Sequence, residues 1–258
     1  MNPKGVKPTI RVGDIFPTTK GGECLVIKYE GKTKITVIFK ENMNYEIVTS
    51  SKTLRAGHIL NPYFARYYEF GYLGVGEYKM CDNQKSTPSY TAWKFLLLRL
   101  FSEDRLSSNP TYRGCSICKE WANFQVFSEW FYSHNSYGLG YEIDKDLLVQ
   151  GNKHYSPETC VMIPQEINKA LKTVQVNTVV AGVRKRINTK GYQVRVTEHG
   201  KRRHVGEFYT VEEASAAYVQ AKERYIKNLA LSWANRIEWK AYKALMEWKV
   251  YPENKGAV

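Results

Sequence analysis

The chain has 258 residues, of which 43% are hydrophobic and 24% are charged, and this composition indicates a globular protein and excludes a disordered one. Its formal net charge of +13 favours a polyanionic partner such as nucleic acid. No apolar run approaches the ~18 residues that a membrane span requires, so we expect no membrane partner. The five cysteines are odd in number and scattered, which favours a reducing compartment over a disulfide framework.

The charge is distributed unevenly along the chain. Residues 1–75 carry 11 Lys or Arg against 6 Asp or Glu, residues 76–176 carry 11 against 11, and residues 177–258 carry 16 against 8. A neutral, carboxylate-bearing centre therefore lies between two basic flanks. This pattern fits a metal site that its neighbours hold on nucleic acid. The alternative is a basic protein whose lysines are only solvated.

The N-terminal residues predict short strands. Residues 25–29 and 34–39 are rich in β-branched residues and are separated by the hairpin signal Glu30-Gly31-Lys32, and residues 44–48 are a third candidate strand. We therefore expect residues 1–69 to form a small β-rich module, either barrel-like or a curled sheet. It would bind DNA or serve as a folding cap.

Two helices are predicted in the centre of the chain. Residues 89–101 predict a helix that begins with a Ser cap after Pro88, and residues 102–114 predict a polar loop. Residues 120–132 predict a second helix, because its aromatic residues recur every three or four positions. Such a stripe belongs to a core far more often than to a base-stacking surface. Its members are Trp121, Phe124, Phe127, Trp130 and Phe131.

Residues 141–171 predict a strand, a polar turn, a short apolar strand at 161–163 and a helix from near Pro164. This frame can aim carboxylate and amide oxygens at one divalent cation, because hard cations prefer oxygen ligands on a rigid support. The candidate polar residues are Asp144, Asp146, Asn152, His154 and Asn168.

The same stretch resembles the HNH nuclease motif, the ββα-metal fold, in a divergent form common in phage and bacterial genomes. With the Tyr90–Trp93 and Cys118–Phe124 patterns, the resemblance covers about residues 70–172, and we expect a domain over 70–176. No histidine stands where the family keeps its general base. The matching residues are Asp144-Lys145-Asp146 on the first strand, Asn152 in the turn, Pro157-Glu158-Thr159 for the family's Pro-Glu-Asn, and Asn168 on the helix.

The resemblance implies a homing-type DNA endonuclease that uses Mg²⁺ or Mn²⁺. Asp144, or Asp146, and Asn168 would ligate the metal. The general base would be the other carboxylate, a water on the metal, or His154. Lys145 would be protonated at neutral pH and would neutralise charge in the transition state.

The missing histidine favours a second interpretation, a regulatory or architectural DNA-binding protein on a nuclease frame that has lost activity. An RNA-processing nuclease is a third. Because the N-terminal residues lack the pattern of a signal peptide, we expect a cytoplasmic location, in the bacterial host cell if a phage encodes the protein.

Cys115 and Cys118 form a Cys-x-x-Cys pair that Cys160 and His154 would extend to four zinc ligands. HNH proteins that carry zinc usually do so through two such pairs, and the second pair is missing here. We therefore expect buried, unpaired cysteines and no zinc.

Residues 177–230 predict three strands and a helix that Thr210 caps, with Glu212 and Glu213 in the first turn. Three strands and one amphipathic helix make a minimal two-layer domain. The segment resembles the plant ethylene-response-factor (APETALA-type) DNA-binding domain, which also occurs beside HNH domains in phage proteins. The matching residues are Gly182-Val183-Arg184, Gly206, Phe208, Thr210, Glu212-Glu213-Ala214, Ala217-Tyr218 and Ala221.

This resemblance implies that the sheet lies in the major groove of double-stranded DNA. Arg195, Thr197 and His204 replace a Glu, an Arg and a Trp of the family, so the base preference is not inherited. A solvated basic face is the alternative. The candidate DNA-binding residues are Arg184, Lys185, Arg186, Lys190, Tyr192, Arg195, Lys201, Arg202, Arg203 and His204.

Residues 231–258 predict an amphipathic helix with several tryptophans. It would pack on the body of the protein or on a second subunit, so a homodimer is one possible assembly. Taken together, the patterns predict an α+β protein with a β-rich N-terminal module, a ββα-metal centre and a C-terminal three-stranded antiparallel sheet with a helix.

Overall fold

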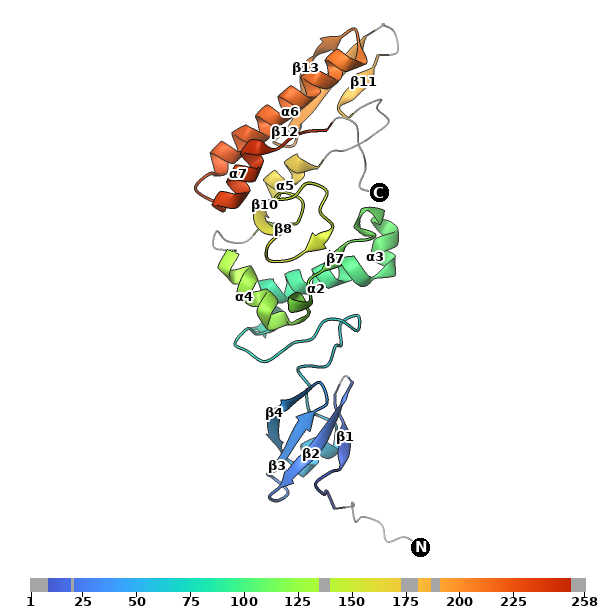
Figure 1. Ribbon diagram of the computed structural model, residues 1–258, viewed down its shortest axis with the longest axis vertical. Helices are drawn as coiled ribbons and strands as arrows, with labels where there is room; N and C mark the ends of the chain where they lie inside the picture. The colour runs from blue at the N-terminus through green and yellow to red at the C-terminus, as the bar shows by residue number, and fades with distance from the viewer. Residues whose placement is uncertain (1–8, 20, 135–139, 173–180, 187–190, 252–258) are drawn as a thin grey trace. The chain divides into compact units, whose positions relative to one another are not determined.

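The computed structural model describes residues 9–19, 21–134, 140–172, 181–186 and 191–251 of a mixed α+β protein (Figure 1). The chain divides into two compact units. Unit 1 comprises residues 1–103 and 119–129, and unit 2 comprises residues 104–118 and 130–258. None of the helices in the described ranges is both long and apolar enough to cross a membrane.

Unit 1 begins with an open antiparallel sheet of four strands in sequential order. The order starts at β1 and ends at β4, so the sheet is not the closed barrel that was one of two expectations, whereas the β-rich module and its hairpin after Glu30 are confirmed. The core side of the sheet buries Ile35, Val37 and Phe39. The strands are β1 (Ile15–Pro17), β2 (Glu23–Tyr29), β3 (Ile35–Phe39) and β4 (Asn42–Thr49).

A short helix, α1 (Ser51–Arg55), follows β4 and was not predicted. Ser50 caps it by accepting a hydrogen bond from the backbone N–H of Thr53 at 3.2 Å. Leu54 is fully buried in the core of the sheet. The helix is stabilised by this burial rather than by local periodicity, which five residues are too few to show.

The first predicted central helix is α2 (Pro88–Phe101), and its cap is Thr87 rather than Ser89. The Thr87 hydroxyl accepts from the Tyr90 N–H at 3.4 Å. Pro88 suits the first helical position because its fixed φ matches the helix and it has no N–H to satisfy. Ser89 is buried and accepts a hydrogen bond from Ser128 at 3.1 Å. A two-residue hairpin precedes α2, with strands β5 (Cys81–Asp82) and β6 (Lys85–Ser86).

The second predicted helix is interrupted at Asn123. The Asn123 side chain accepts from the Gln125 N–H at 2.9 Å, which ends one helical segment and begins the next. All five residues of the aromatic stripe are buried, so their assignment to a core is confirmed. The two segments of the second predicted helix are η2 (Lys119–Ala122) and α4 (Phe124–His134).

The expected polar loop at 102–114 is wrong, because most of it is helical. Its two helices are α3 (Glu103–Ser108) and η1 (Pro110–Tyr112).

Unit 2 contains the predicted strand, strand and helix. The strands β8 (Tyr141–Asp144) and β10 (Val161–Pro164) pair antiparallel, and α5 (Gln165–Leu171) follows directly. The loop between the two strands carries β9 (His154–Tyr155), which pairs in parallel with β7 (Ser116–Ile117).

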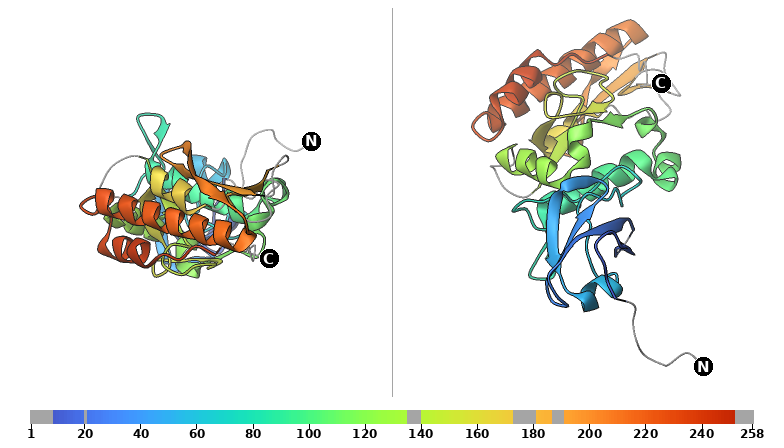
Figure 2. Two further views of the ribbon diagram at one scale, coloured as in Figure 1. Left: turned by 90° about the horizontal axis from the view of Figure 1, so that it is seen from above. Right: turned by 60° about the horizontal axis from the view of Figure 1, so that its bottom comes forward.

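The C-terminal part of unit 2 is the predicted three-stranded antiparallel sheet with a helix along one face (Figures 1 and 2). Thr210 caps the helix as predicted, and Glu213 completes a reciprocal capping box with it. The elements are β11 (Val183–Lys185), β12 (Tyr192–Glu198), β13 (Lys201–Phe208), α6 (Val211–Trp233) and the shorter α7 (Trp239–Glu247).

One hydrophobic core joins these parts of unit 2. Val161 and Ile167 of the strand–helix frame belong to the same buried cluster as Val194 of the sheet and Ala241 of α7. The members of this cluster run from Leu147 to Val250 in the sequence, so they come from both sides of the expected domain boundaries at 176/177 and 230/231. The strand–helix frame and the C-terminal sheet therefore behave as one packed body.

Gly182 permits the close approach of β11 to α6. Its φ is +72°, and a methyl group there would clash with the Tyr218 ring and lie 2.8 Å from the Arg195 carbonyl oxygen. We expect Gly182→Ala to lower the free energy of unfolding by about 1–3 kcal/mol more than Gly200→Ala. Gly200 has a similar φ of +76° but open space around it, so equal losses in thermal unfolding would contradict this explanation.

Candidate functional site

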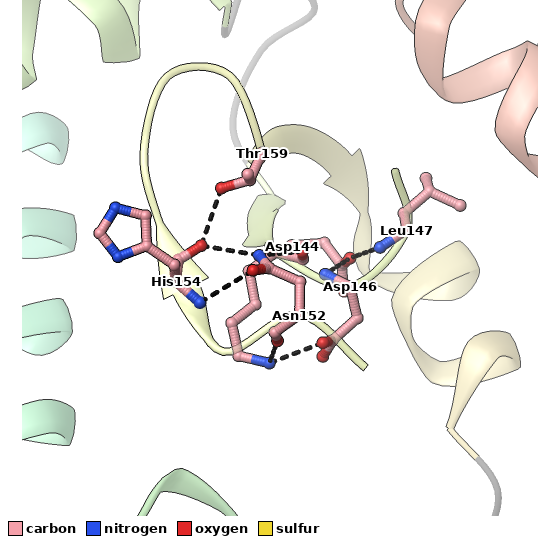
Figure 3. A network of polar contacts seen from close by, with 7 residues as sticks. Asp144, Asp146, Leu147, Asn152, His154 and Thr159 are labelled. Carbon is pink, nitrogen blue, oxygen red and sulfur yellow. Dashed lines mark hydrogen bonds and ion pairs between the residues drawn. The ribbon is translucent and has the colours of Figure 1, made fainter. Parts of the chain in front are cut away.

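Asp144, the first expected metal ligand, ends β8 and organises the turn that follows (Figure 3). Its Oδ1 accepts hydrogen bonds from the backbone N–H groups of Asp146 at 2.9 Å and Leu147 at 2.7 Å. Within the described ranges its Oδ2 accepts none, so one oxygen is left to face a ligand. Burial raises the pKa of Asp144, and the nearby Asp146 carboxylate adds to this, whereas the Leu147 N–H opposes it.

The Lys145 side chain is buried and hydrogen-bonded within the turn that follows β8. Its Nζ donates to the Asn152 carbonyl oxygen at 2.6 Å and to Asp146 Oδ1 at 2.7 Å, and it lies 5.9 Å from the centre of the Tyr155 ring. Only 11% of its side chain is exposed, against 44% for Asp146. These contacts tie the end of β8 to the turn, and they direct the ammonium group into the protein rather than toward solvent.

Asn152 lies in the turn after β8, where the HNH motif has an asparagine, and its side chain holds this turn together. Its Nδ2 donates to the carbonyl oxygens of Lys145 at 2.8 Å and His154 at 2.7 Å, and its Oδ1 accepts from the His154 N–H at 3.0 Å. One amide side chain therefore joins both ends of the turn, because it has donors and an acceptor.

His154, one candidate for the general base, is not brought to the carboxylates. Figure 3 shows its ring directed away from Asp144 and Asp146. Its Nδ1 lies 2.8 Å from the hydroxyl of Ser116 on β7, and its backbone carbonyl accepts from Thr159 at 2.7 Å. The strand pairing of β9 with β7 fixes this orientation.

Asn168, the second expected ligand, contacts Glu142, an acid that was not predicted from the sequence. Its Nδ2 donates to Glu142 Oε2, and Gln165 donates to Glu142 Oε1 at 3.1 Å. A carboxylate can only accept, so the Asn168 amide must turn its nitrogen to Glu142, which leaves Oδ1 available. Two signals could have identified Glu142: it shares a strand face with Asp144, and Gln165 and Asn168 are one helical turn apart.

These side chains fit a hard divalent cation in their donor chemistry. The Asp144 carboxylate and the Asn168 amide each keep one oxygen available, and Mg²⁺ and Mn²⁺ prefer such oxygens. In the part of the chain that the structure describes, no three His, Cys, Asp or Glu side chains are grouped around one metal position.

The cysteines differ from the expectation in their exposure. Cys24 and Cys160 are buried, but Cys115 and Cys118 are half-buried and Cys81 is exposed. Burial raises the pKa of the Cys160 thiol to about 12, so the thiol is protonated at neutral pH.

The strand register divides the expected DNA-binding residues between the two faces of the C-terminal sheet. Val183, Val194 and Val196 are buried against α6, and we call their side of the sheet the helix face. Alternate residues point to the opposite side, which we call the open face. The open face carries Arg184, Arg186, Gln193, Arg195, Thr197, Arg202, His204 and Glu207.

Four of the expected residues lie on the helix face or its margin. Arg203 pairs across the strands with buried Val196, and its Nε forms an ion pair with Glu198 Oε2 at 3.0 Å. Lys190 lies outside the described residues. The other three on this side are Lys185, Tyr192 and Lys201.

Polar contacts join α5 to the C-terminal sheet and helix. Glu166 accepts from Trp233 Nε1 at 3.1 Å through one oxygen and lies 2.7 Å from His199 Nδ1 through the other. The backbone N–H of His199 donates to the Tyr225 hydroxyl at 2.8 Å. Since Asn168 is on the same helix as Glu166, these contacts hold Asn168 in a fixed arrangement with the sheet.

Comparison of the chain with protein-family models, with curated proteins and with solved structures gave no match. The similarities to HNH nucleases and to the APETALA-type domain rest on the residues quoted above.

We expect Asp144→Ala to lower the free energy of unfolding by about 1–3 kcal/mol, because two backbone donors lose their acceptor. Asp144→Asn should recover most of this loss, since its amide oxygen can accept the same bonds. Urea unfolding of both variants tests the role, and equal losses would show that the hydrogen bonds to Oδ1 are not what stabilises the turn.

The raised pKa of Asp144 also predicts a pH dependence. The folded protein holds this proton more tightly than the unfolded chain, so the stabilisation is complete below the ordinary value of 3.8 and is lost as pH rises through the folded pKa. Relative to Asp144→Asn, the wild-type protein should therefore lose stability as pH rises from about 3.8. Unfolding in chelator across this range measures the difference, and a constant difference would contradict the assignment.

Proposed function

We propose that this protein binds double-stranded DNA through the open face of its C-terminal sheet. The observation that carries the proposal is the gathering of four arginines, Arg184, Arg186, Arg195 and Arg202, on the face opposite α6. A narrow antiparallel sheet fits the major groove, and arginine is the side chain that most often contacts guanine there.

The electrostatics of the open face support the same function. Arg184, Arg195 and Arg202 are exposed, and none of the ion pairs in the described ranges involves them. Guanidinium groups that form no ion pair within the protein can displace counterions from DNA phosphates. This release of counterions supplies a large share of the affinity for a duplex. Because the sheet packs on α6 and α5 through a shared core, these groups are held on a rigid support.

A second candidate activity, cleavage of the bound DNA as an HNH-type endonuclease, is favoured by a separate observation. β8, β10 and α5 form the strand–strand–helix frame of that motif in the same unit as the sheet. Asp144 and Asn168 would hold Mg²⁺ or Mn²⁺. When bound, such an ion supplies Lewis-acid stabilisation to a phosphodiester.

The other polar residues of this frame would act as supports. Glu142 orients the Asn168 amide, and Lys145 and Asn152 hold the turn after Asp144. With the His154 ring on Ser116, the half-exposed Asp146 is the remaining side chain that could accept a proton from water, beside a water on the metal. If neither Asp146 nor such a water can accept this proton, the protein would bind DNA without cutting it.

We expect Arg184→Ala with Arg202→Ala to weaken duplex binding and to reduce the slope of log K against log salt by up to about 2, as two phosphate or base contacts are lost. Lys185→Ala with Arg203→Ala is the matched control, since each residue adjoins one of the pair but lies on the helix face. Fluorescence anisotropy over a salt series measures both. Equal effects of the two double variants would reject the open face as the DNA-binding surface.

We expect supercoiled plasmid to be nicked in Mg²⁺ or Mn²⁺ and not in chelator. Asp144→Asn and Asn168→Ala should abolish nicking, whereas Glu158→Gln, an exposed acid of the same loop, should retain it. Binding of DNA without cleavage in either metal would reject the nuclease candidate and leave the DNA-binding proposal in place.

A further inference from the structure

Glu207 is an acidic side chain on the basic open face, near the end of the edge strand β13. It lies opposite Gln193, and Gln193 lies opposite Arg184, so the three form a row across all three strands. Glu207 Oε2 also forms an ion pair with Arg186 Nη1 at 2.7 Å. The expectations from sequence included neither Glu207 nor Gln193.

Stability does not account for a carboxylate at this position. The side chains of Arg186 and Glu207 are 45% and 46% exposed, and an ion pair this exposed contributes little to the free energy of unfolding. On a surface that binds phosphates, a negative charge also weakens affinity for every sequence alike. A group that lowers general affinity in this way is typical of a residue that selects among sequences.

The geometry of the pair matches the chemistry of one base pair. In the major groove a G·C pair presents acceptors on guanine, O6 and N7, beside a donor on cytosine, the N4 amino group. Arg186 offers donors and Glu207 offers an acceptor, held 2.7 Å apart by their ion pair. An arginine contacts guanine and a glutamate accepts from cytosine N4 by the ordinary rules of base recognition.

With the row laid along the major groove, the spacing of the sheet would bring its other members to neighbouring base pairs. Adjacent strands lie about 4.8 Å apart, and successive base pairs lie about 3.4 Å apart. Gln193 and Arg184, one and two strands from Glu207, therefore reach base pairs one to three steps away. Glutamine suits adenine and arginine suits guanine, so the row has the composition of a sequence-selective surface.

We propose that Glu207 is a specificity-determining residue, and that the Arg186–Glu207 pair recognises one G·C base pair in the major groove. This inference rests on the proposed binding of DNA by the open face, and it names the chemical feature that the face selects. Glu207 holds Arg186 against guanine and itself accepts from cytosine, so a phosphate or an A·T pair at the same place leaves its carboxylate unmatched.

The test is selection from a randomised duplex pool with the full chain as wild type, Glu207→Ala and Glu198→Ala. Glu198→Ala is the matched control, because Glu198 forms a similar ion pair, 3.0 Å from Arg203, on the helix face. The wild type should enrich a motif with a G·C pair that Glu207→Ala no longer requires. Replacing that pair by A·T should weaken wild-type and Glu198→Ala binding by about five-fold or more, and Glu207→Ala binding much less.

Binding to an unselected duplex supplies the second readout. Glu207→Ala should bind it more tightly than the wild type, since a negative charge has left the DNA-binding surface. Circular dichroism checks that each variant is folded.

The outcomes separate the inference from the proposal on which it rests. Failure of the wild type to bind any duplex at low salt rejects DNA binding itself. Wild-type binding with the same motif and the same G·C preference in Glu207→Ala overturns the inference alone. Wild-type binding that enriches no motif also overturns it, because there is then no selectivity for Glu207 to determine.

Discussion

Burial of Val183, Val194 and Val196 against α6 is the constraint on which the functional surface depends. Once these valines face the helix, the pleat of the strands sends alternate side chains to solvent. The arginines of the open face are held there because an apolar face on the other side anchors the sheet. The same packing explains Gly182, whose missing side chain lets β11 approach Tyr218.

The residues that carry the nuclease resemblance serve the fold as well as any chemistry. Asp144 caps a turn, Lys145 and Asn152 close it, and Glu142 orients Asn168. A carboxylate with one oxygen on backbone N–H groups and the other available is a structural position that could also serve as a metal ligand. Hydrogen-bonded supports of this kind fix the ligands that a metal needs.

The shared core of unit 2 connects the two candidate activities. Val161 of β10 and Val194 of β12 lie in one buried cluster, and Glu166 adds polar contacts to His199 and Trp233. The surface proposed to bind DNA and the frame that resembles a nuclease are thus parts of one body. DNA held on the open face would have a fixed geometry relative to Asp144 and Asn168.

The sequence by itself determined β8, β10, α5 and the C-terminal sheet with α6, because strand alternation, the Thr210 cap and the hydrophobic runs are local signals. It also identified the aromatic stripe as core. Only the tertiary structure decided which basic residues share a face, since a β-bulge at Val205 changes the alternation of β13 and brings His204 and Glu207 to the same side. Glu142 and the orientation of His154 likewise depend on contacts between β8 and α5 and between β7 and β9. Such contacts join residues far apart in the chain. A local pattern can suggest a participant, as the alternation of β8 does for Glu142, but it does not specify the partner.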